Sequence, residues 1–270
     1  MGRAPLLLST FCFLLGFAYT MFALGRGRYH RSLFNFTVIL AGFLFQTIFL
    51  YQRGVDIGRC PLTNLFEVLI FLSWSMVLIY LVVGTSYRLS LLGVFTSPLV
   101  FLFQVIAILS PIDIPSTLKP VHNPWLSMHA AISMVAYGAF ALSCVAGVMY
   151  LVQEKQLKTH RLRTFFFDLP PIADLAVVIN RLLFLGFILL TVGLVAVGVG
   201  GSKPDSTGNP LQLIKIAWLG GVWMIYAGIL IAKLWRRLSP RRTAWLSVAA
   251  FAVALSTLWG LNFISDKVHF

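Results

Sequence analysis

Eight apolar stretches occupy most of this 270-residue chain, and each is long enough to cross a lipid bilayer. A helix needs about 20 apolar residues to cross the hydrocarbon layer, where it satisfies its own backbone hydrogen bonds. Charged residues make up 11% of the chain, whereas a soluble domain carries about a quarter. We therefore predict an all-α integral membrane protein, a single domain over residues 1–270 built as a bundle of eight transmembrane helices. The predicted spans are 5–24, 33–51, 64–84, 90–110, 124–152, 180–199, 211–232 and 243–264.

The formal net charge of +13 comes from basic residues that cluster in the connectors between the spans. Positively charged connectors are retained on the cytoplasmic side of a membrane. The more basic set of connectors contains Arg26, Arg28, Arg31, Arg88, Lys155, Lys158, Arg161, Arg163, Arg181, Lys233, Arg236, Arg237, Arg241 and Arg242. The opposite set contains Arg3, Arg53, Arg59, Lys119, Lys203, Lys215 and Lys267. This bias predicts external termini in a bacterial inner membrane, and contact with the anionic headgroups of the lipid bilayer rather than with nucleic acid.

Two histidines are predicted to share the external face, because odd-numbered spans begin there and even-numbered spans end there. His129 lies near the start of the fifth span, and His269 follows the eighth. Neutral imidazole binds haem iron axially, and one ring on each side gives a six-coordinate site. Trp125 lies four residues before His129 on the same helical face and offers an aromatic wall. His122 is a rival ligand, and in the alternative interpretation His129 only makes a hydrogen bond in the bundle while His269 belongs to a frayed tail.

Asn64 and Glu67 open the third span on this same face. An ionisable residue at the start of a span indicates a functional site. Asn64-x-x-Glu67 also fits a capping box, in which Asn64 caps the helix and Glu67 reaches back to the amide of Asn64. The two interpretations can coexist. The cations available to haem propionates at this level are Arg53, Arg59, Lys119, Lys203 and Lys215.

Four segments of the chain, taken in order, resemble one protein family. They are CPLTNLFEVLIFLSW (60–74), NPWLSMHAAISMVAYGAFAL (123–142), LPPIADLAVVINRLLFLGFILLTVGL (169–194) and RRTAWLSVAAFAVALSTLWGLNF (241–263), the last followed by His269. Over about residues 60–270 the chain resembles the cytochrome c assembly proteins of the CcsA, HemX and YpjD kind. The resemblance implies a non-covalent, b-type haem with His129 and His269 as axial ligands of its iron. It further implies that Trp125 forms a wall of the site and that Asn64 and Glu67 order its rim.

The chain departs from the tryptophan-rich external segment that is the hallmark of the family's best-known members. The corresponding region, residues 198–215, reads GVGGSKPDSTGNPLQLIK and lacks the upstream tryptophans and the aspartate of that hallmark. Lys215, Trp218 and Trp223 align with the family's Lys-x-x-Trp and the tryptophan that follows, so the resemblance assigns both tryptophans to the cofactor site. The pattern is typical of the shorter HemX- and YpjD-like members. It does not favour the haem-attaching synthase activity, and we identify no catalytic residue.

These features leave three functions open. The first is a haem-handling protein of cytochrome c biogenesis that presents haem on the external face, for which the resemblance implies a ResB-type membrane partner and apocytochrome c. The second is a non-catalytic, HemX-like regulator or scaffold in haem metabolism that works through the basic cytoplasmic connectors. The third is a small-solute transporter. Against the third, the spans carry almost no ionisable residue at mid-depth, and no internal repeat indicates an inverted-repeat transporter.

Overall fold

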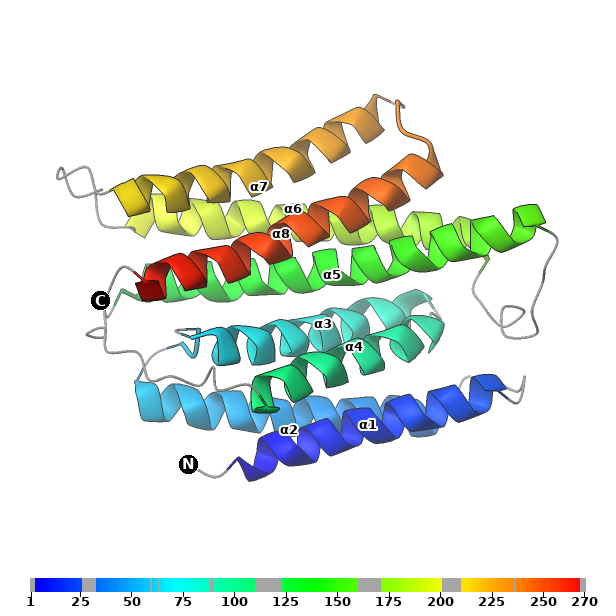
Figure 1. The fold of residues 1–270 in the computed structure, drawn as a ribbon, viewed down its shortest axis with the longest axis horizontal. Helices are drawn as coiled ribbons and strands as arrows, with labels where there is room; N and C mark the ends of the chain where they lie inside the picture. The colour runs from blue at the N-terminus through cyan, green and yellow to red at the C-terminus, as the bar shows by residue number, and fades with distance from the viewer. Residues whose placement is uncertain are drawn as a thin grey trace.

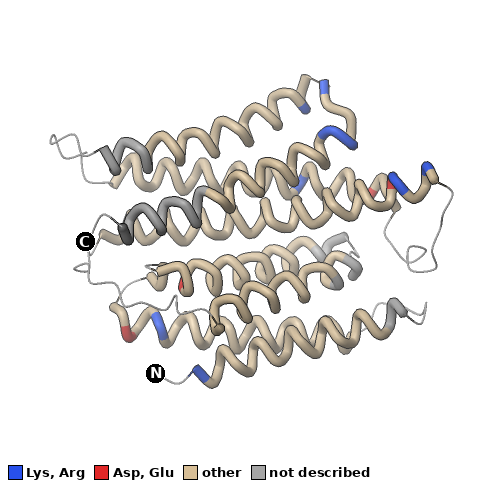
Figure 2. Tube along the Cα trace, viewed as in Figure 1, with Lys and Arg blue, Asp and Glu red and all other residues tan. Residues whose placement is uncertain are grey.

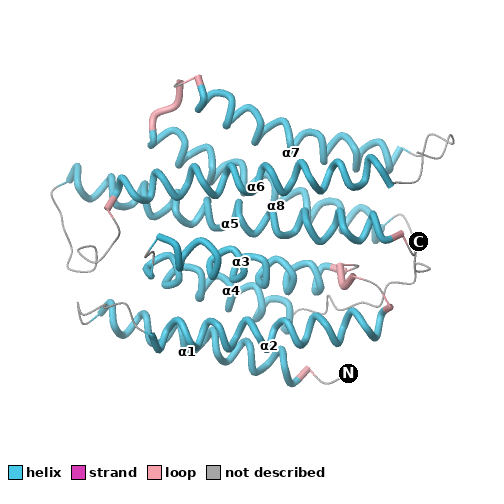
Figure 3. The backbone as a smooth tube through the Cα atoms, turned by 180° about the vertical axis from the view of Figure 1, so that it is seen from behind, coloured by secondary structure: helices cyan, strands magenta, loops and turns pink. Residues whose placement is uncertain are grey.

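Eight helices lie alongside one another in the computed structural model (Figure 1). They are α1 (Ala4–Gly25), α2 (Leu33–Ile57), α3 (Leu65–Tyr87), α4 (Ser90–Leu109), α5 (Pro124–Thr159), α6 (Ile172–Gly200), α7 (Pro210–Leu234) and α8 (Pro240–Lys267). The structure describes residues 3–25, 33–58, 60–62, 64–87, 90–109, 123–159, 171–200, 210–235 and 237–267. Every element within these ranges is a helix or a connecting loop (Figure 3), so the predicted all-α class and the predicted eight helices are confirmed.

Six helices, judged on the described residues, are long and apolar enough to cross a membrane. They are Ala4–Phe22, Leu33–Ile57, Leu65–Val83, Pro124–Thr159, Ile172–Gly200 and Ile216–Leu234. The apolar part of α4, Phe95–Leu109, is shorter, and the side chains of α8 beyond Ser256 lie outside the described residues. The chain is therefore a multi-pass membrane protein, and the crossing of the bilayer by α4 and α8 stays a prediction.

The helices α5 and α6 extend beyond the predicted membrane spans at their facing ends. We expected a connector from the end of the fifth span at 152 to the start of the sixth at 180, but α5 continues to Thr159 and α6 begins at Ile172. Polar residues such as Glu154 and Lys158 end an apolar stretch without ending a helix. Their carboxylate and ammonium groups pair across one turn at 2.8 Å, which supports the helical conformation.

The two ends of the bundle differ in charge (Figure 2). Among the described side chains, the end at which α5 stops and α6 starts carries the acidic Glu154 and Asp174 and a larger number of basic residues: Lys155, Lys158, Arg181, Lys233, Arg237, Arg241 and Arg242. The end that holds the N-terminus carries Arg3 and Arg53, together with the acidic Asp56 and Glu67. The distribution agrees with the predicted bias, because basic residues gather at the end assigned to the cytoplasm.

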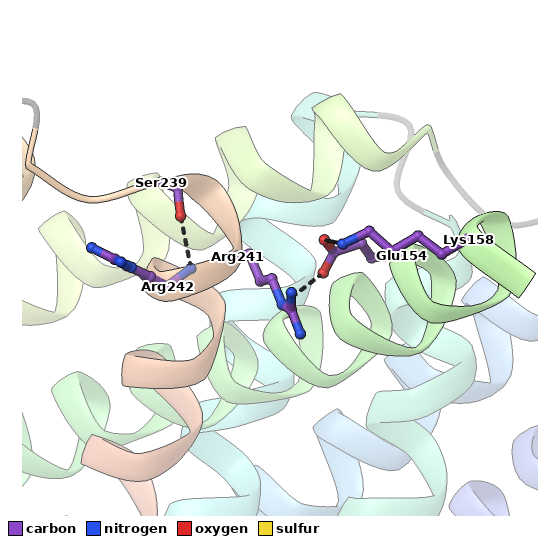
Figure 4. Close-up of polar contacts among 5 residues, drawn as sticks. All are labelled: Glu154, Lys158, Ser239, Arg241 and Arg242. Carbon is purple, nitrogen blue, oxygen red and sulfur yellow. Dashed lines mark hydrogen bonds and ion pairs between the residues drawn. The ribbon is translucent and has the colours of Figure 1, made fainter.

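At the basic end, the carboxylate of Glu154 joins α5 to α8 (Figure 4). It accepts a hydrogen bond from Lys158 and lies 3.3 Å from Nε of Arg241. Ser239 caps α8, since its hydroxyl accepts a 3.4 Å hydrogen bond from the backbone N–H of Arg242 and Pro240 occupies the first helical position. The cap and the ion pair fix where α8 enters the bundle.

The helices form two groups of four that share one pattern of neighbours. In the first group, α1 and α3 each pack on α2 and α4; in the second, α5 and α7 each pack on α6 and α8. The groups are stacked, with α1 and α2 at one edge of the bundle and α7 at the other (Figures 1 and 3). Because each group has four helices, α5 starts at the same end of the bundle as α1. Each helix of the second group therefore runs in the same direction as its equivalent in the first. The arrangement is a parallel repeat, and it differs from the inverted repeats of transporters.

The first group contains an aromatic cluster at the contact between α2 and α3. Nε1 of Trp74 donates a 2.8 Å hydrogen bond to Oγ1 of Thr47, and the indole stacks on Phe43 with ring centroids 5.5 Å apart. The hydroxyl of Thr47 in turn donates to the carbonyl of Phe43 at 2.8 Å. The cluster satisfies an indole N–H that would otherwise face hydrocarbon without a partner.

The second group repeats this cluster at the contact between α6 and α7. Nε1 of Trp223 donates to Oγ1 of Thr191 at 3.0 Å, and its ring lies 5.4 Å from that of Phe187, whose carbonyl accepts from Thr191 at 2.8 Å. The shared sequence signal is Gly-Phe-x-x-x-Thr, at residues 42–47 and 186–191. Three identities in six residues are too few to reveal a repeat before the contacts are known.

The two groups meet where α5 packs on α3. Gly138 of α5 lies against the backbone of α3, and a Cβ atom at this position would be 2.8 Å from the carbonyl carbon of Ser75 and 3.0 Å from the nitrogen of Met76. Small residues permit this close approach of helices in a membrane, where packing rather than the hydrophobic effect holds helices together. The junction therefore depends on the absence of a side chain at Gly138.

Candidate functional site

The start of α3, at the end of the bundle that holds the N-terminus, carries the predicted cap. The side-chain oxygen of Asn64 accepts a 2.8 Å hydrogen bond from the backbone N–H of Glu67, which confirms the capping interpretation of Asn64. The carboxylate of Glu67 is buried, and its Oε1 accepts a 2.9 Å bond from Nε of Arg53 at the end of α2. Arg53, which we had counted among the cations available to haem propionates, is thus engaged by Glu67.

A second positive charge lies beside this pair. The guanidinium groups of Arg3 and Arg53 are each 5.8 Å from the ring centroid of Phe66, within the range of a cation–π contact. The N-terminal end of α1, the C-terminal end of α2 and the start of α3 are therefore joined around Phe66 and Glu67. Asn64 and Glu67 stand at this end of the bundle as ordered, partnered groups, which suits the rim of a site.

His129 lies on the first turns of α5, partly buried against α6. Its Nδ1 is 2.7 Å from the carbonyl oxygen of Gly193. A carbonyl only accepts hydrogen bonds, so Nδ1 carries a proton and Nε2 is the ring nitrogen that this contact leaves for a ligand bond. A backbone carbonyl that holds the far nitrogen is how proteins orient histidines that ligate metals. His129 therefore fits an axial ligand of haem iron with Nε2 as the coordinating atom.

Asn123 joins the start of α5 to the end of α6, a role that sequence reasoning missed. Its Oδ1 accepts a 3.0 Å bond from the backbone N–H of Trp125, and its Nδ2 donates to the carbonyl of Gly200 at 3.2 Å. The ring of Trp125 lies on the backbone of Gly200 and is 42% exposed. Asparagine directly before Pro124 is the available signal, because this pair is typical of a helix start.

Glu67 and His129 lie at the same depth in the bundle. Gly138 contacts α3 between Ser75 and Met76. From this contact each helix runs nine residues toward the end that holds the N-terminus, to His129 on α5 and to Phe66–Glu67 on α3. At 1.5 Å per residue both positions lie about 13 Å from the contact. The structure therefore brings His129, Asn64 and Glu67 to one end of the bundle, as parity predicted.

The two tryptophans of α7 differ in their surroundings. Trp223 is held against Thr191 of α6, two residues from the carbonyl of Gly193 that binds His129. Trp218 lies five residues nearer the start of α7 and is 44% exposed. Trp223 thus supports the helix that orients His129, and Trp218 offers an exposed aromatic surface closer to the end of the bundle.

Several predicted site residues lie outside the described part of the chain. They are His269, the rival ligand His122, Arg59, Lys119 and Lys203, and the side chain of Lys215 is likewise not described. Within the described ranges His129 is the one histidine, and no group of three or more His, Cys, Asp or Glu side chains stands together. The second axial ligand stays a prediction.

Cys60, in the connector between α2 and α3, is expected to react slowly with a membrane-impermeant maleimide at pH 7. Burial, and then the negative charge of Glu67, raise the pKa of this thiol. The reactive thiolate is therefore scarce near neutrality, and the labelling rate should rise steadily up to pH 9. The rate is measured on intact cells with Cys12 and Cys144 replaced by alanine. Fast labelling at pH 7 contradicts the raised pKa, and labelling confined to broken cells contradicts an external Cys60.

Comparison with known proteins gives one family. Residues 62–199 match the family described as Cytochrome C assembly protein. Relatives named Cytochrome c biogenesis protein CcsA include one from Guillardia theta, 26% identical over 83% of this chain and 80% of its own length, and one from Prochlorococcus marinus (strain MIT 9215), 26% identical over 86% and 82%. A third, from Chlorella vulgaris, is 34% identical over 55% of this chain and 50% of its own length.

Proposed function

This chain belongs to the cytochrome c assembly protein family, and from that premise we propose that it is a haem-handling membrane protein of cytochrome c biogenesis. In this proposal it presents haem on the external side of the membrane and does not itself attach it. The observation that carries the proposal is the hydrogen bond from Nδ1 of His129 to the carbonyl of Gly193, which leaves Nε2 as a ligand atom.

The residues of the site have separate roles in this proposal. His129 and His269 bind the iron of a non-covalent, b-type haem, and Trp125 and Trp218 supply exposed aromatic walls. Trp223 supports the site through α6, while Asn64 and Glu67 order its rim. When bound, haem supplies a redox-active iron, and the chain supplies ligands, orientation and a surrounding of low polarity.

The orientation follows from charge. We propose that all eight helices cross a bacterial inner membrane and that both termini are external, because basic side chains gather at the opposite end of the bundle. The haem site then faces the compartment in which a ResB-type membrane partner and apocytochrome c would meet it.

A HemX-like regulator is the second candidate, and the basic end supports it. There Trp235 is 66% exposed, and the guanidinium of Arg237 lies 5.1 Å from its ring centroid. An exposed aromatic and cationic surface is suited to a protein partner on the cytoplasmic side. This function needs no haem, so the absorption spectrum of the protein separates the two candidates.

Protein purified in mild detergent from haem-replete cells is expected to show a Soret band that His129→Ala and His269→Ala each abolish. His129→Gln is the matched control for folding, because its amide can still donate to the carbonyl of Gly193 but cannot take the place of imidazole on iron. It should fold like the parent and also lack the bis-histidine spectrum. Colourless parent protein, or a spectrum that survives His129→Gln, overturns the haem proposal; the first result favours the regulator.

A further inference from the structure

The second group of helices carries an open groove on one face. The groove lies between α7 and α8, has a volume of about 410 Å³, and is lined by apolar side chains that include Met224, Ile225, Gly228, Ala249 and Val253. Met224 is 64% exposed, and a Cβ atom at Gly228 would meet no atom within 4 Å. Leu238, in the connector between these two helices, also lines the groove.

The equivalent face of the first group is covered. Matching Trp74 of α3 with Trp223 of α7 places Ser75 and Met76 at the positions of Met224 and Ile225. Ser75 and Met76 are fully buried, because Gly138 of α5 packs on them. The face of α3 beside α4 therefore receives a membrane helix, while the same face of α7 beside α8 is bare.

The helix equivalent to α5 is α1. Phe13 of α1 lies against Gly42 of α2 just as Phe140 of α5 lies against Gly186 of α6. When Phe13 is matched with Phe140, Phe11 of α1 takes the position that Gly138 has in α5.

The surface of α1 around Phe11 is exposed, although its counterpart on α5 is buried. Phe11 is 56% exposed, and Leu7 and Leu15 are exposed with it. The residues of α5 in the same register, Met134 and Leu142, are buried. The chain thus carries two complementary bare surfaces, on α1 and on α7, at opposite edges of the bundle (Figure 1).

We propose that the groove between α7 and α8 binds helix α1 of a second copy of this chain, as the groove between α3 and α4 binds α5. Both helices begin at the same end of the bundle, so a second copy inserted in the same orientation presents α1 in the direction that the groove needs. In this register Phe11 enters where the internal contact has a glycine and lies beside Met224 and Ile225. One turn further on, Leu15 lies beside Gly228, where a Cβ atom would meet no atom within 4 Å.

This contact is heterologous, since it joins different surfaces of the two copies. Repeated contacts of this kind close into a ring when the rotation that relates one copy to the next adds up to a full turn. The contact does not depend on haem. A lipid chain and a helix of another protein are the competing occupants, and neither is expected to place Phe11 of one copy beside Ile225 of another.

Disulfide cross-linking of two differently tagged copies tests the proposal. Cys12, Cys60 and Cys144 are first replaced by alanine or serine; one copy then carries Phe11→Cys and the other Ile225→Cys. Mild oxidation of membranes should give a linked pair in at least about tenfold higher yield than a control, because groups held together react at a high effective concentration. The control pairs Phe11→Cys with Ile188→Cys, on the exposed face of α6. Equal yields overturn the proposal.

Gly228→Leu provides an independent test, because a Cβ atom at this position meets no atom within 4 Å and the larger side chain occupies the groove. The parent should have a mass of at least two chains of 30.1 kDa in nanodiscs, and the variant should shift toward one chain. A parent of single-chain mass overturns the proposal. The proposal is also overturned if Gly228→Leu releases bound lipid or a different protein but leaves the number of copies of this chain per particle unchanged.

Discussion

Gly138→Leu is expected to lower the apparent unfolding temperature of the detergent-solubilised protein by roughly 10 °C and to separate the two groups of helices. The nearest atoms to an added Cβ are the carbonyl carbon and the Cβ of Ser75, both at 2.8 Å, and the nitrogen of Met76 at 3.0 Å. Two of these are backbone atoms of a buried helix and the third is bonded directly to that backbone, so none can rotate away as the end of a flexible side chain can. Overpacking of this kind costs about 3 kcal/mol or more, since α5 must move off α3 along its length.

Gly138→Ala should already destabilise the protein, although alanine is intrinsically the better helix former by about 1 kcal/mol. Gly198→Ala is the matched control, because the added Cβ meets no atom within 4 Å and the intrinsic preference acts alone. The measurement is thermal unfolding followed by loss of the monodisperse peak, with limited proteolysis between α4 and α5 as the local readout. If both alanine variants behave alike, the close contact at Gly138 does not hold the groups together.

Glu67→Ala is expected to cost about 2–3 kcal/mol, near the lower end of the range for breaking a buried ion pair. The carboxylate of Glu67 is 1% exposed and binds Arg53 at 2.9 Å, so its loss leaves a guanidinium with little access to water. The exposed part of Arg53, 18% of its side chain, moderates the cost. The cap itself survives, because Asn64 accepts from the backbone N–H of residue 67 whatever its side chain.

Glu154→Ala is the comparison, since its carboxylate also bridges basic groups but these partners are more than half exposed. Exposed ion pairs contribute about 1 kcal/mol or less. Chemical denaturation of both variants, together with Arg53→Ala and the double variant, gives the coupling energy of the Glu67–Arg53 pair. A Glu67→Ala variant no less stable than Glu154→Ala shows that the pair does not hold the external ends of α2 and α3.

Apolar length predicted the number and order of the helices because crossing a bilayer imposes the same requirement on every span. It did not locate the facing ends of α5 and α6, since Glu154 and Lys158 leave the hydrocarbon without leaving the helix. The repeat was invisible for a different reason. Its evidence lies in tertiary contacts such as those of Trp74 and Trp223, which need no extended sequence identity.

Local chemistry was predictable at the site, and long-range pairing was not. The cap of Asn64 follows from a spacing of three residues, and the position of His129 at the same end of the bundle follows from parity. The partner of Glu67 was missed because Arg53 is on another helix, and the carbonyl of Gly193 offers no side chain to recognise. Every residue has a backbone carbonyl, so only the packing of α5 on α6 identifies the carbonyl of Gly193 as the partner of His129.

The order of the two groups along the chain also bears on how the protein is made. Helices α1 to α4 can leave the translocon and associate while the ribosome is still translating α5, because they already form a closed set of neighbours. At 5–20 residues per second, synthesis from Leu109 to Thr159 takes roughly 3–10 s, and during this time the face of α3 at Ser75 and Met76 meets lipid instead of Gly138. A nascent chain halted after α4 should therefore be inserted but vulnerable to membrane proteases, until the fifth helix covers that face.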